Sequence, residues 1–244
     1  MRSRIVPVKN IARLSAASKA LTNRAPNAPG MGLVEGETGY GKSTAIAWLA
    51  NQSPSIYVRA MAVWTPSAML GAMARELRLP VGGSCAAQVE RIIEALAEGR
   101  QTVFVDEADY IVNSTRMTET LRDLHDVATV PVVLIGMAGI SQRLSQRKQL
   151  TGRLAQHVTF EQMDLDDTSL LARELAEVTV QPDLIEHLHG QARGSVRLIV
   201  VALARIEQMA RSRGLGSIGM ADLGKKAALF TGEAPAGVPM PVAA

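Results

Sequence analysis

The segment from Gly36 to Ser43 reads Gly-Glu-Thr-Gly-Tyr-Gly-Lys-Ser and satisfies the phosphate-binding pattern G-x-x-x-x-G-K-[ST]. Its glycines let successive backbone N–H groups turn toward phosphate oxygens, and a following helix adds the positive end of its dipole. We expect Lys42 to meet the β- and γ-phosphates of a nucleotide and Ser43 to ligate Mg²⁺. The predicted nucleotide-binding residues of this loop are Gly36, Glu37, Thr38, Gly39, Tyr40, Gly41, Lys42, Ser43 and Thr44.

A second chemical signal is the apolar run that begins at Val103 and ends in the two carboxylates Asp106 and Glu107. We expect Asp106, at the tip of a strand, to hold the Mg²⁺ shell, and Glu107 to polarise the attacking water. No Asn-Lys-x-Asp sequence for guanine recognition occurs in the chain. ATP with Mg²⁺ is therefore the predicted cofactor.

Alternating elements must position these residues. Five short apolar strands are expected, separated by helices, which predicts an α/β fold with a parallel five-stranded sheet covered on both faces. The expected strands are 31–35, 55–60, 102–105, 130–136 and 156–160. After residue 160 the strands are expected to stop, and four helices are predicted at 166–177, 182–189, 195–213 and 220–230.

These elements divide the chain into four predicted parts. They are a basic N-terminal arm and helix (1–30), a P-loop core (31–162), a small α-helical lid (163–230) and a flexible tail (231–244). Thr65 followed by Pro66, and Ser84, are expected to begin two helices of the core.

Charge is unevenly distributed along the chain. The net charge of +3 hides a first stretch of 34 residues that carries six basic residues and no acid. These are Arg2, Arg4, Lys9, Arg13, Lys19 and Arg24. Contact with a polyanion such as nucleic acid, a solvated helix and an organelle address are the three interpretations.

Several function classes are not expected. The longest apolar run is about half of the ~20 residues that span a bilayer, and the N-terminus lacks the apolar region of a signal peptide. One cysteine, Cys85, cannot form an internal disulfide, so a reducing cytoplasm is the predicted location. His187 and His189 would point to different faces of a helix, and no metal site is expected there.

Residues 106–109 spell Asp-Glu-Ala-Asp, the name-giving motif of a helicase family. That family is similar to two RecA-like domains joined in one chain, whereas the sheet here is expected to end near residue 160. Gly136-Met137-Ala138 also stands in place of that family's Ser-Ala-Thr. The helicase interpretation is therefore rejected.

The order of core and helical lid resembles the AAA+ ATPases, a branch of the ASCE P-loop NTPases. Four segments make the chain similar to the target-DNA activator ATPases of Mu-like transposing phages, which are grouped with TnsC- and IstB-type transposition ATPases. The segments are Trp64-Thr65-Pro66-Ser67, Val105-Asp106-Glu107-Ala108-Asp109, Leu134-Ile135-Gly136-Met137 and Gly194-Ser195-Val196-Arg197-Leu198. The resemblance covers roughly residues 8 to 230.

The resemblance also implies roles for particular residues. Arg197 matches the sensor-2 arginine that touches the γ-phosphate, and Arg153 the arginine finger that a neighbouring subunit supplies in trans. Arg147 is the rival for that second role. Met137 stands where many AAA+ proteins have a polar sensor-1 residue.

Candidate DNA contacts are Arg59, Arg143 and Lys148. The last two lie in the acid-free stretch 143–153, which would look the same at a subunit interface. Loops after the second strand face the central DNA in related assemblies, which also nominates Trp64, although a tryptophan is more often a core residue.

Together these features predict an ATP-dependent, non-specific DNA-binding AAA+ ATPase that assembles on target DNA as a ring or helical filament. Its partners would be double-stranded DNA, further copies of itself and a transposase, with no membrane involved. The alternatives are a secretion-type AAA+ assembly ATPase of the ExeA kind and a nucleotide-gated scaffold with negligible hydrolysis. Slow turnover, stimulated by DNA or by assembly, is expected for the first.

Overall fold

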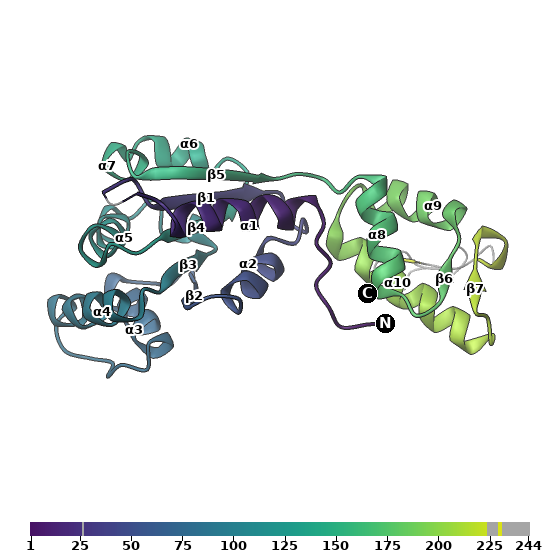
Figure 1. The fold of residues 1–244 in the computed structure, drawn as a ribbon, viewed down its shortest axis with the longest axis horizontal. Coiled ribbons are helices and arrows are strands. Elements are labelled where there is room, and N and C mark those ends of the chain that lie inside the picture. Colours follow the sequence, from purple (N-terminus) through teal and green to yellow (C-terminus); the bar gives the residue numbers. More distant parts are fainter. Residues whose placement is uncertain (26, 224–228, 231–244) are drawn as a thin grey trace, which may run out of the picture. The chain divides into compact units, whose positions relative to one another are not determined.

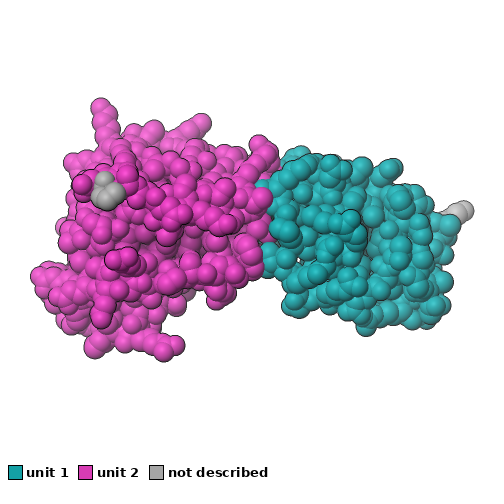
Figure 2. All heavy atoms as spheres, in the orientation of Figure 1, with its two compact units in different colours: residues 1–9, 39–41, 162–244 teal, residues 10–38, 42–161 magenta. Residues whose placement is uncertain are grey.

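The computed structural model describes residues 1–25, 27–223 and 229–230 (Figure 1). The predicted tail, 231–244, lies outside the described residues. The chain forms two compact units, coloured separately in Figure 2. Unit 1 consists of residues 1–9, 39–41 and 162–244, and unit 2 of residues 10–38 and 42–161.

Unit 2 is built on a five-stranded sheet in the order β2-β3-β4-β1-β5, and every paired strand is parallel. Every residue of β1 and β3 is buried, as expected when helices cover both faces. The strands are β1 (Met31–Gly36), β2 (Ser55–Arg59), β3 (Thr102–Asp106), β4 (Val132–Met137) and β5 (Leu154–Phe160). The predicted parallel α/β sheet is confirmed.

Two helices of unit 2 begin where the sequence signals predict. Thr65 Oγ1 accepts a hydrogen bond from the backbone N–H of Ala68 at 3.3 Å, and Ser84 Oγ accepts one from Ala87 at 3.2 Å. The helices are α1 (Lys9–Thr22), α2 (Lys42–Ala50), α3 (Pro66–Glu76), α4 (Cys85–Gly99), the 3₁₀ turn η1 (Ala108–Tyr110), α5 (Thr115–Ala128), α6 (Ile140–Ser145) and α7 (Lys148–Thr151).

Helix α1 buries its apolar stripe, including Leu14 and Leu21, within unit 2. A Cβ at Gly32 would lie 2.9 Å from the Leu21 Cδ1 atom, so glycine in β1 allows the helix to approach the sheet closely. Figure 1 shows α1 running along β1.

Unit 1 contains α8 (Leu165–Leu175), α9 (Pro182–Ala192) and α10 (Val196–Ser212). It also contains two short parallel strands, β6 (Thr179–Val180) and β7 (Ser217–Ile218), so the prediction that strands stop after residue 160 was wrong. Strands of two residues are too short to show an alternating apolar pattern.

The prediction of a helix over residues 220–230 was also wrong for its first residues. The described part is a single 3₁₀ turn, η2 (Met220–Asp222), followed by Leu223 in extended conformation. Residues 224–228 lie outside the described residues, and residues 229–230 are not helical.

The predicted N-terminal arm does not form a separate part of the chain. Residues 1–9 belong to unit 1, where the backbone N–H of Arg2 donates to the Leu175 carbonyl at 2.7 Å and that of Lys9 to Asp167 Oδ1 at 3.3 Å. Val6 and Val8 are buried. Residues 10–22, in contrast, belong to unit 2.

Candidate functional site

The glycine-rich loop joins the end of β1 to the start of α2. Gly39 and Gly41 have φ of +91° and +86°, in the left-handed region that side chains rarely adopt. Ser43 and Thr44 are exposed in the first turn of α2. The loop therefore has the backbone that the phosphate-binding pattern requires.

Lys42 is held by neutral oxygen atoms. Its ammonium group donates to the carbonyl of Gly36 at 2.5 Å and to that of Glu37 at 2.9 Å. Burial lowers the pKa of Lys42 below its ordinary value, and the nearby carboxylates of Asp106 and Glu107 oppose that shift. The loop and the carboxylate pair stand at the carboxyl ends of two parallel strands, β1 and β3, of the same sheet.

Asp106 ends β3 and is only 2% exposed. Its Oδ2 accepts a hydrogen bond from the Tyr57 hydroxyl at 2.5 Å, and its Oδ1 accepts one from the backbone N–H of Glu107 at 2.9 Å. Burial, and then the bond to Asp106, raise the pKa of Tyr57. Sequence reasoning missed Tyr57, although its place two residues before the end of the neighbouring strand β2 could have suggested it.

Glu107 follows directly, in a left-handed conformation with φ of 54°. Its Oε1 lies 3.1 Å from the guanidinium of Arg59, which stands opposite Asp106 in the register of β2 and β3. Arg59, a predicted DNA contact, is therefore paired with the predicted catalytic carboxylate.

The end of β4 lies beside the loop, because Met137 stands opposite Gly36 in the register of β1 and β4. The backbone N–H of Met137 donates to Asp109 Oδ2 at 2.7 Å, and Arg143 of α6 forms an ion pair with Asp109. Arg143, the second predicted DNA contact, is thus also paired with an acid.

The two arginine-finger candidates flank α7 and differ in their partners. Arg153 forms an ion pair with Asp126, its Nε lying 2.6 Å from Oδ1, and this pair lowers the pKa of Asp126. Arg147 donates to the hydroxyl of Thr115 at 2.6 Å and to the Asn113 carbonyl at 2.8 Å. Among the described residues, Arg147 has no carboxylate within 4.0 Å.

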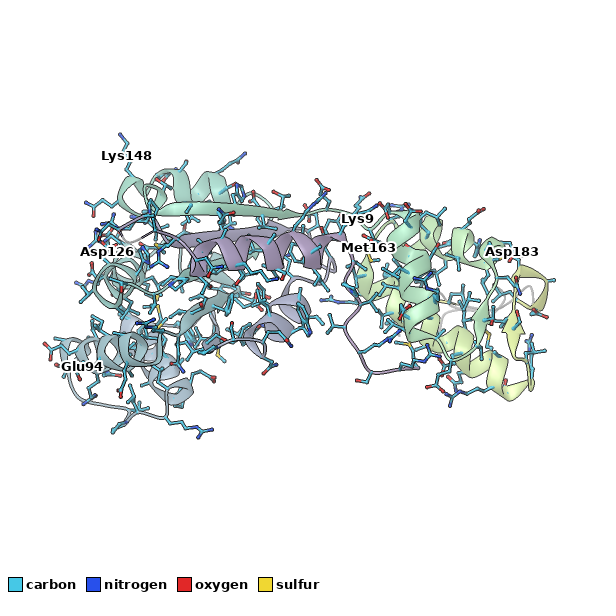
Figure 3. The ribbon with its side chains drawn as sticks, viewed as in Figure 1. Lys9, Glu94, Asp126, Lys148, Met163 and Asp183 are labelled. Atoms are coloured by element: carbon cyan, nitrogen blue, oxygen red, sulfur yellow. The ribbon has the colours of Figure 1, made fainter. Side chains whose placement is uncertain are left out.

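Lys148, the third predicted DNA contact, is exposed on α7. Its side chain extends away from the ribbon in Figure 3. Within the described part of the chain no carboxylate lies within 4.0 Å of its ammonium group.

Arg197, the predicted sensor-2 residue, lies in the first turn of α10 in unit 1. Its backbone N–H donates to the carbonyl of Gly39 at 3.1 Å, one of the three loop residues that belong to unit 1. Ser195 caps the helix by accepting from Leu198 at 3.4 Å. The side chain of Arg197 is exposed.

Three of the six cations of the N-terminal stretch are paired with carboxylates. Arg4 pairs with Glu174 and Lys9 with Asp164 in unit 1, and Arg13 pairs with Glu161 in unit 2. The Arg24 guanidinium donates to the Leu21 carbonyl at 2.9 Å, and its burial lowers its pKa.

The residues present fit a nucleotide carried with Mg²⁺. The loop offers backbone amides and an ammonium for phosphate, while the Ser43 hydroxyl and the Asp106 carboxylate are the hard oxygen donors that Mg²⁺ prefers. Among the described residues, no three His, Cys, Asp or Glu side chains form a group that could hold a metal ion by themselves.

Fold and loop together define the fold class, an α/β fold with the parallel five-stranded sheet and glycine-rich loop of P-loop proteins. Residues 25–144 match the family model described as "AAA domain", which includes the loop, β3 and β4. A comparison with curated proteins gives no match. In the described residues, no helix is both long and apolar enough to cross a membrane.

Solved structures share the fold at low sequence identity. The Orc1 protein of Aeropyrum pernix in complex with DNA has a TM-score of 0.66 at 19% identity, over 91% of this chain and 64% of that one. The ORC2 protein of the same organism, in ADPNP-ADP complexes, has a TM-score of 0.72 at 17% identity, over 91% and 68%. The Thermotoga maritima RuvB Holliday junction branch migration motor has a TM-score of 0.60 at 17% identity, over 89% of this chain and 67% of that one. This chain thus spans about two thirds of their length.

Proposed function

We propose that this chain is an ATP-dependent, non-specific DNA-binding AAA+ ATPase that assembles on target DNA and stimulates a transposase. The observation that carries the proposal is the shared sheet edge, because the loop with Lys42 follows β1 and the Asp106-Glu107 pair stands at the carboxyl end of β3, a parallel strand of the same sheet. In parallel sheets this edge is where ligands bind. The AAA domain match over residues 25–144 supports the same site.

Within this proposal each residue has a physical task. Lys42 exchanges its two carbonyl partners for phosphate oxygens, which offer a stronger, charge-assisted hydrogen bond. Mg²⁺ bound with the nucleotide would neutralise developing charge, held by Ser43 and Asp106. Glu107 orients the attacking water, and its release from Arg59 frees the carboxylate oxygen that does so.

We propose that a neighbouring subunit supplies an arginine to this site, as the family resemblance implies. The contacts favour Arg147 over Arg153, because Arg147 gives up only a hydroxyl and a carbonyl whereas Arg153 must leave Asp126. Arg197 would contact the γ-phosphate from α10. ATP would thus order the assembly, and hydrolysis would release it.

For DNA, the exposed Lys148 is the strongest of the three predicted contacts, because Arg59 and Arg143 each have an acidic partner. The similar Orc1 protein of Aeropyrum pernix is in complex with DNA, and the similar RuvB of Thermotoga maritima is a Holliday junction branch migration motor. A transposase as partner rests on the motif resemblance alone. A location in a reducing cytoplasm rests on the single cysteine, Cys85.

Co-sedimentation with duplex DNA, with ATP, with ADP and without nucleotide, tests the proposal. DNA recovery that requires ATP and is independent of sequence supports it. Absence of DNA recovery in the presence of bound ATP would favour the ExeA-like assembly ATPase.

A second candidate, a nucleotide-gated scaffold with negligible hydrolysis, is favoured by Met137, whose thioether cannot hydrogen-bond a phosphate as a polar sensor-1 side chain would. A steady-state ATPase assay with DNA separates the two. ATP-dependent DNA binding without turnover would support the scaffold.

A further inference from the structure

Glu35 is a buried carboxylate that the proposed mechanism does not use. It lies in β1 directly before Gly36 and is 8% exposed. Burial alone would raise its pKa, but hydrogen bonds from Ser141 and His157 outweigh burial and hold the pKa below its ordinary value. A carboxylate kept ionised in the interior of the sheet edge must be compensated by the groups that it binds.

Those groups belong mainly to the segment that follows β4. Glu35 Oε2 accepts from the backbone N–H of Gly139 at 3.1 Å and from that of Ser141 at 3.3 Å. The Ser141 hydroxyl lies 3.0 Å from both carboxylate oxygens. His157 Nε2 of β5 lies 2.8 Å from Oε1 and completes the set.

The two preceding amides of the same segment are also held. Met137 N–H donates to Asp109 Oδ2 at 2.7 Å, and Ala138 N–H donates to the Gly36 carbonyl at 3.2 Å. A Cβ at Gly136 would lie 2.6 Å from Asp109 Oδ2, so a larger residue there would displace the carboxylate from this position. The N–H groups of residues 137, 138, 139 and 141 thus all have partners.

The Gly36 carbonyl connects this segment to the lysine of the loop. It accepts from Ala138 N–H and also from the Lys42 ammonium, at 3.2 and 2.5 Å. A shift of residues 137–141 would therefore move an oxygen atom that positions the ammonium group.

From these contacts we infer that Glu35 and Asp109 are positioning residues, which fix segment 137–141 through its backbone amides against the first residue of the P-loop. This inference rests on the proposed ATPase function. The inference accounts for a methionine at the sensor-1 position. The backbone of residues 137–141 is held by hydrogen bonds to its amides and does not depend on the side chain of Met137. Asp109, the last residue of the Asp-Glu-Ala-Asp sequence, thereby has a positioning role.

The inference separates turnover from affinity. In Glu35→Ala the backbone amides of the loop and the charge of Lys42 are retained. The Ala138 N–H, which donates to the Gly36 carbonyl, is no longer held in a fixed position. We expect kcat for ATP to fall about tenfold while the Kd for a fluorescent ATP analogue stays within about threefold. Glu35→Gln keeps an acceptor oxygen for one amide and should lie between Glu35→Ala and the wild type.

Hydrogen exchange gives a readout that does not depend on turnover. We expect peptides covering residues 137–141 to exchange at least about tenfold faster in Glu35→Ala, because bound amides are protected in proportion to the opening equilibrium. The matched control is Glu94→Ala, which removes an exposed carboxylate of α4 in the same unit (Figure 3). It should change neither exchange at 137–141 nor kcat.

Asp109 supplies a second pair of variants if Glu35→Ala does not fold. Asp109→Asn keeps an oxygen for the Met137 amide and should retain most of kcat, whereas Asp109→Ala should lose as much as Glu35→Ala. Unchanged exchange at 137–141 in both alanine variants would overturn the inference. So would loss of kcat and of analogue affinity in equal proportion. If the wild type neither binds nor hydrolyses ATP, the proposed function fails, and the exchange result alone decides whether these carboxylates hold the segment.

Discussion

The loop edge of unit 2 and the N-terminal stretch both carry cations, but different groups hold them. Lys42 contacts two carbonyl oxygens and keeps its full charge. Arg4, Lys9 and Arg13 each contact a carboxylate, so each pair is neutral at a distance. The comparison shows that a count of basic residues along a sequence overstates the charge available to a phosphate ligand.

Energetics sharpen the difference. Exposed ion pairs contribute about 0–1 kcal/mol to stability, so the N-terminal pairs cost little to break, but DNA gains only what remains after the acid is released. Lys42 has no hydrogen-bonded carboxylate to release before it can bind phosphate, because its direct partners are carbonyls. Four predictions test this difference and the roles of the site residues.

Lys42→Ala should have the broadest effect, because it acts on ATP binding and on DNA recovery together. It removes the charge that meets the phosphates, and we expect the Kd for a fluorescent ATP analogue to rise at least about a hundredfold, with loss of ATP-dependent DNA recovery. Lys19→Ala removes the same single positive charge from an exposed position of α1 and serves as the control. Wild-type affinity in the Lys42 variant would mean that the site is misassigned.

Glu107→Gln should reduce turnover by about a hundredfold or more while ATP still binds, because the amide cannot activate water. The protein should then accumulate as an ATP-bound assembly on DNA, which sedimentation in excess ATP measures. Rapid disassembly of this variant would contradict the role of Glu107.

Two variants beside α7 compare an arginine that has neutral partners with one that is paired with a carboxylate. They are Arg147→Ala and Arg153→Ala. We expect Arg147→Ala to bind ATP normally but to lose turnover by about 10³-fold, and to recover part of it when mixed with Lys42→Ala, since each subunit supplies what the other lacks. Arg153→Ala should instead lower the free energy of unfolding by about 1 kcal/mol through loss of its pair with Asp126. The reverse pattern would return the finger to Arg153, the residue that the sequence predicts.

The smallest effects should come from the N-terminal cations. Each phosphate contact adds a slope of about −0.9 to the logarithm of the DNA-binding constant against the logarithm of salt concentration. Lys148→Ala should flatten the slope by roughly one such contact, while Arg4→Ala with Lys9→Ala should leave it unchanged. A flatter slope in the double variant would show that these pairs open for DNA and would restore the sequence interpretation of a polyanion-binding arm.

Local signals account for what the sequence could predict. The glycine loop, the caps at Thr65 and Ser84 and the five strands each depend on neighbouring residues, and the structure confirms the strands and caps. The partners of the site residues could not be predicted this way. Tyr57 reaches Asp106, and Glu35 reaches Ser141, only because strands distant in sequence lie side by side in register. The roles of the loop and carboxylates stay predictions.

The division of the first 22 residues between the units has a consequence for synthesis on the ribosome. Lys9 and its partner Asp164 are 155 positions apart, so at about 5–20 residues per second the N-terminal segment waits on the order of ten seconds before its partner is made. Val6 and Val8, which are buried in the finished structure, belong to the same segment. Residues 1–9 can therefore complete their hydrogen bonds to unit 1 only after residues 162 and onward have been made.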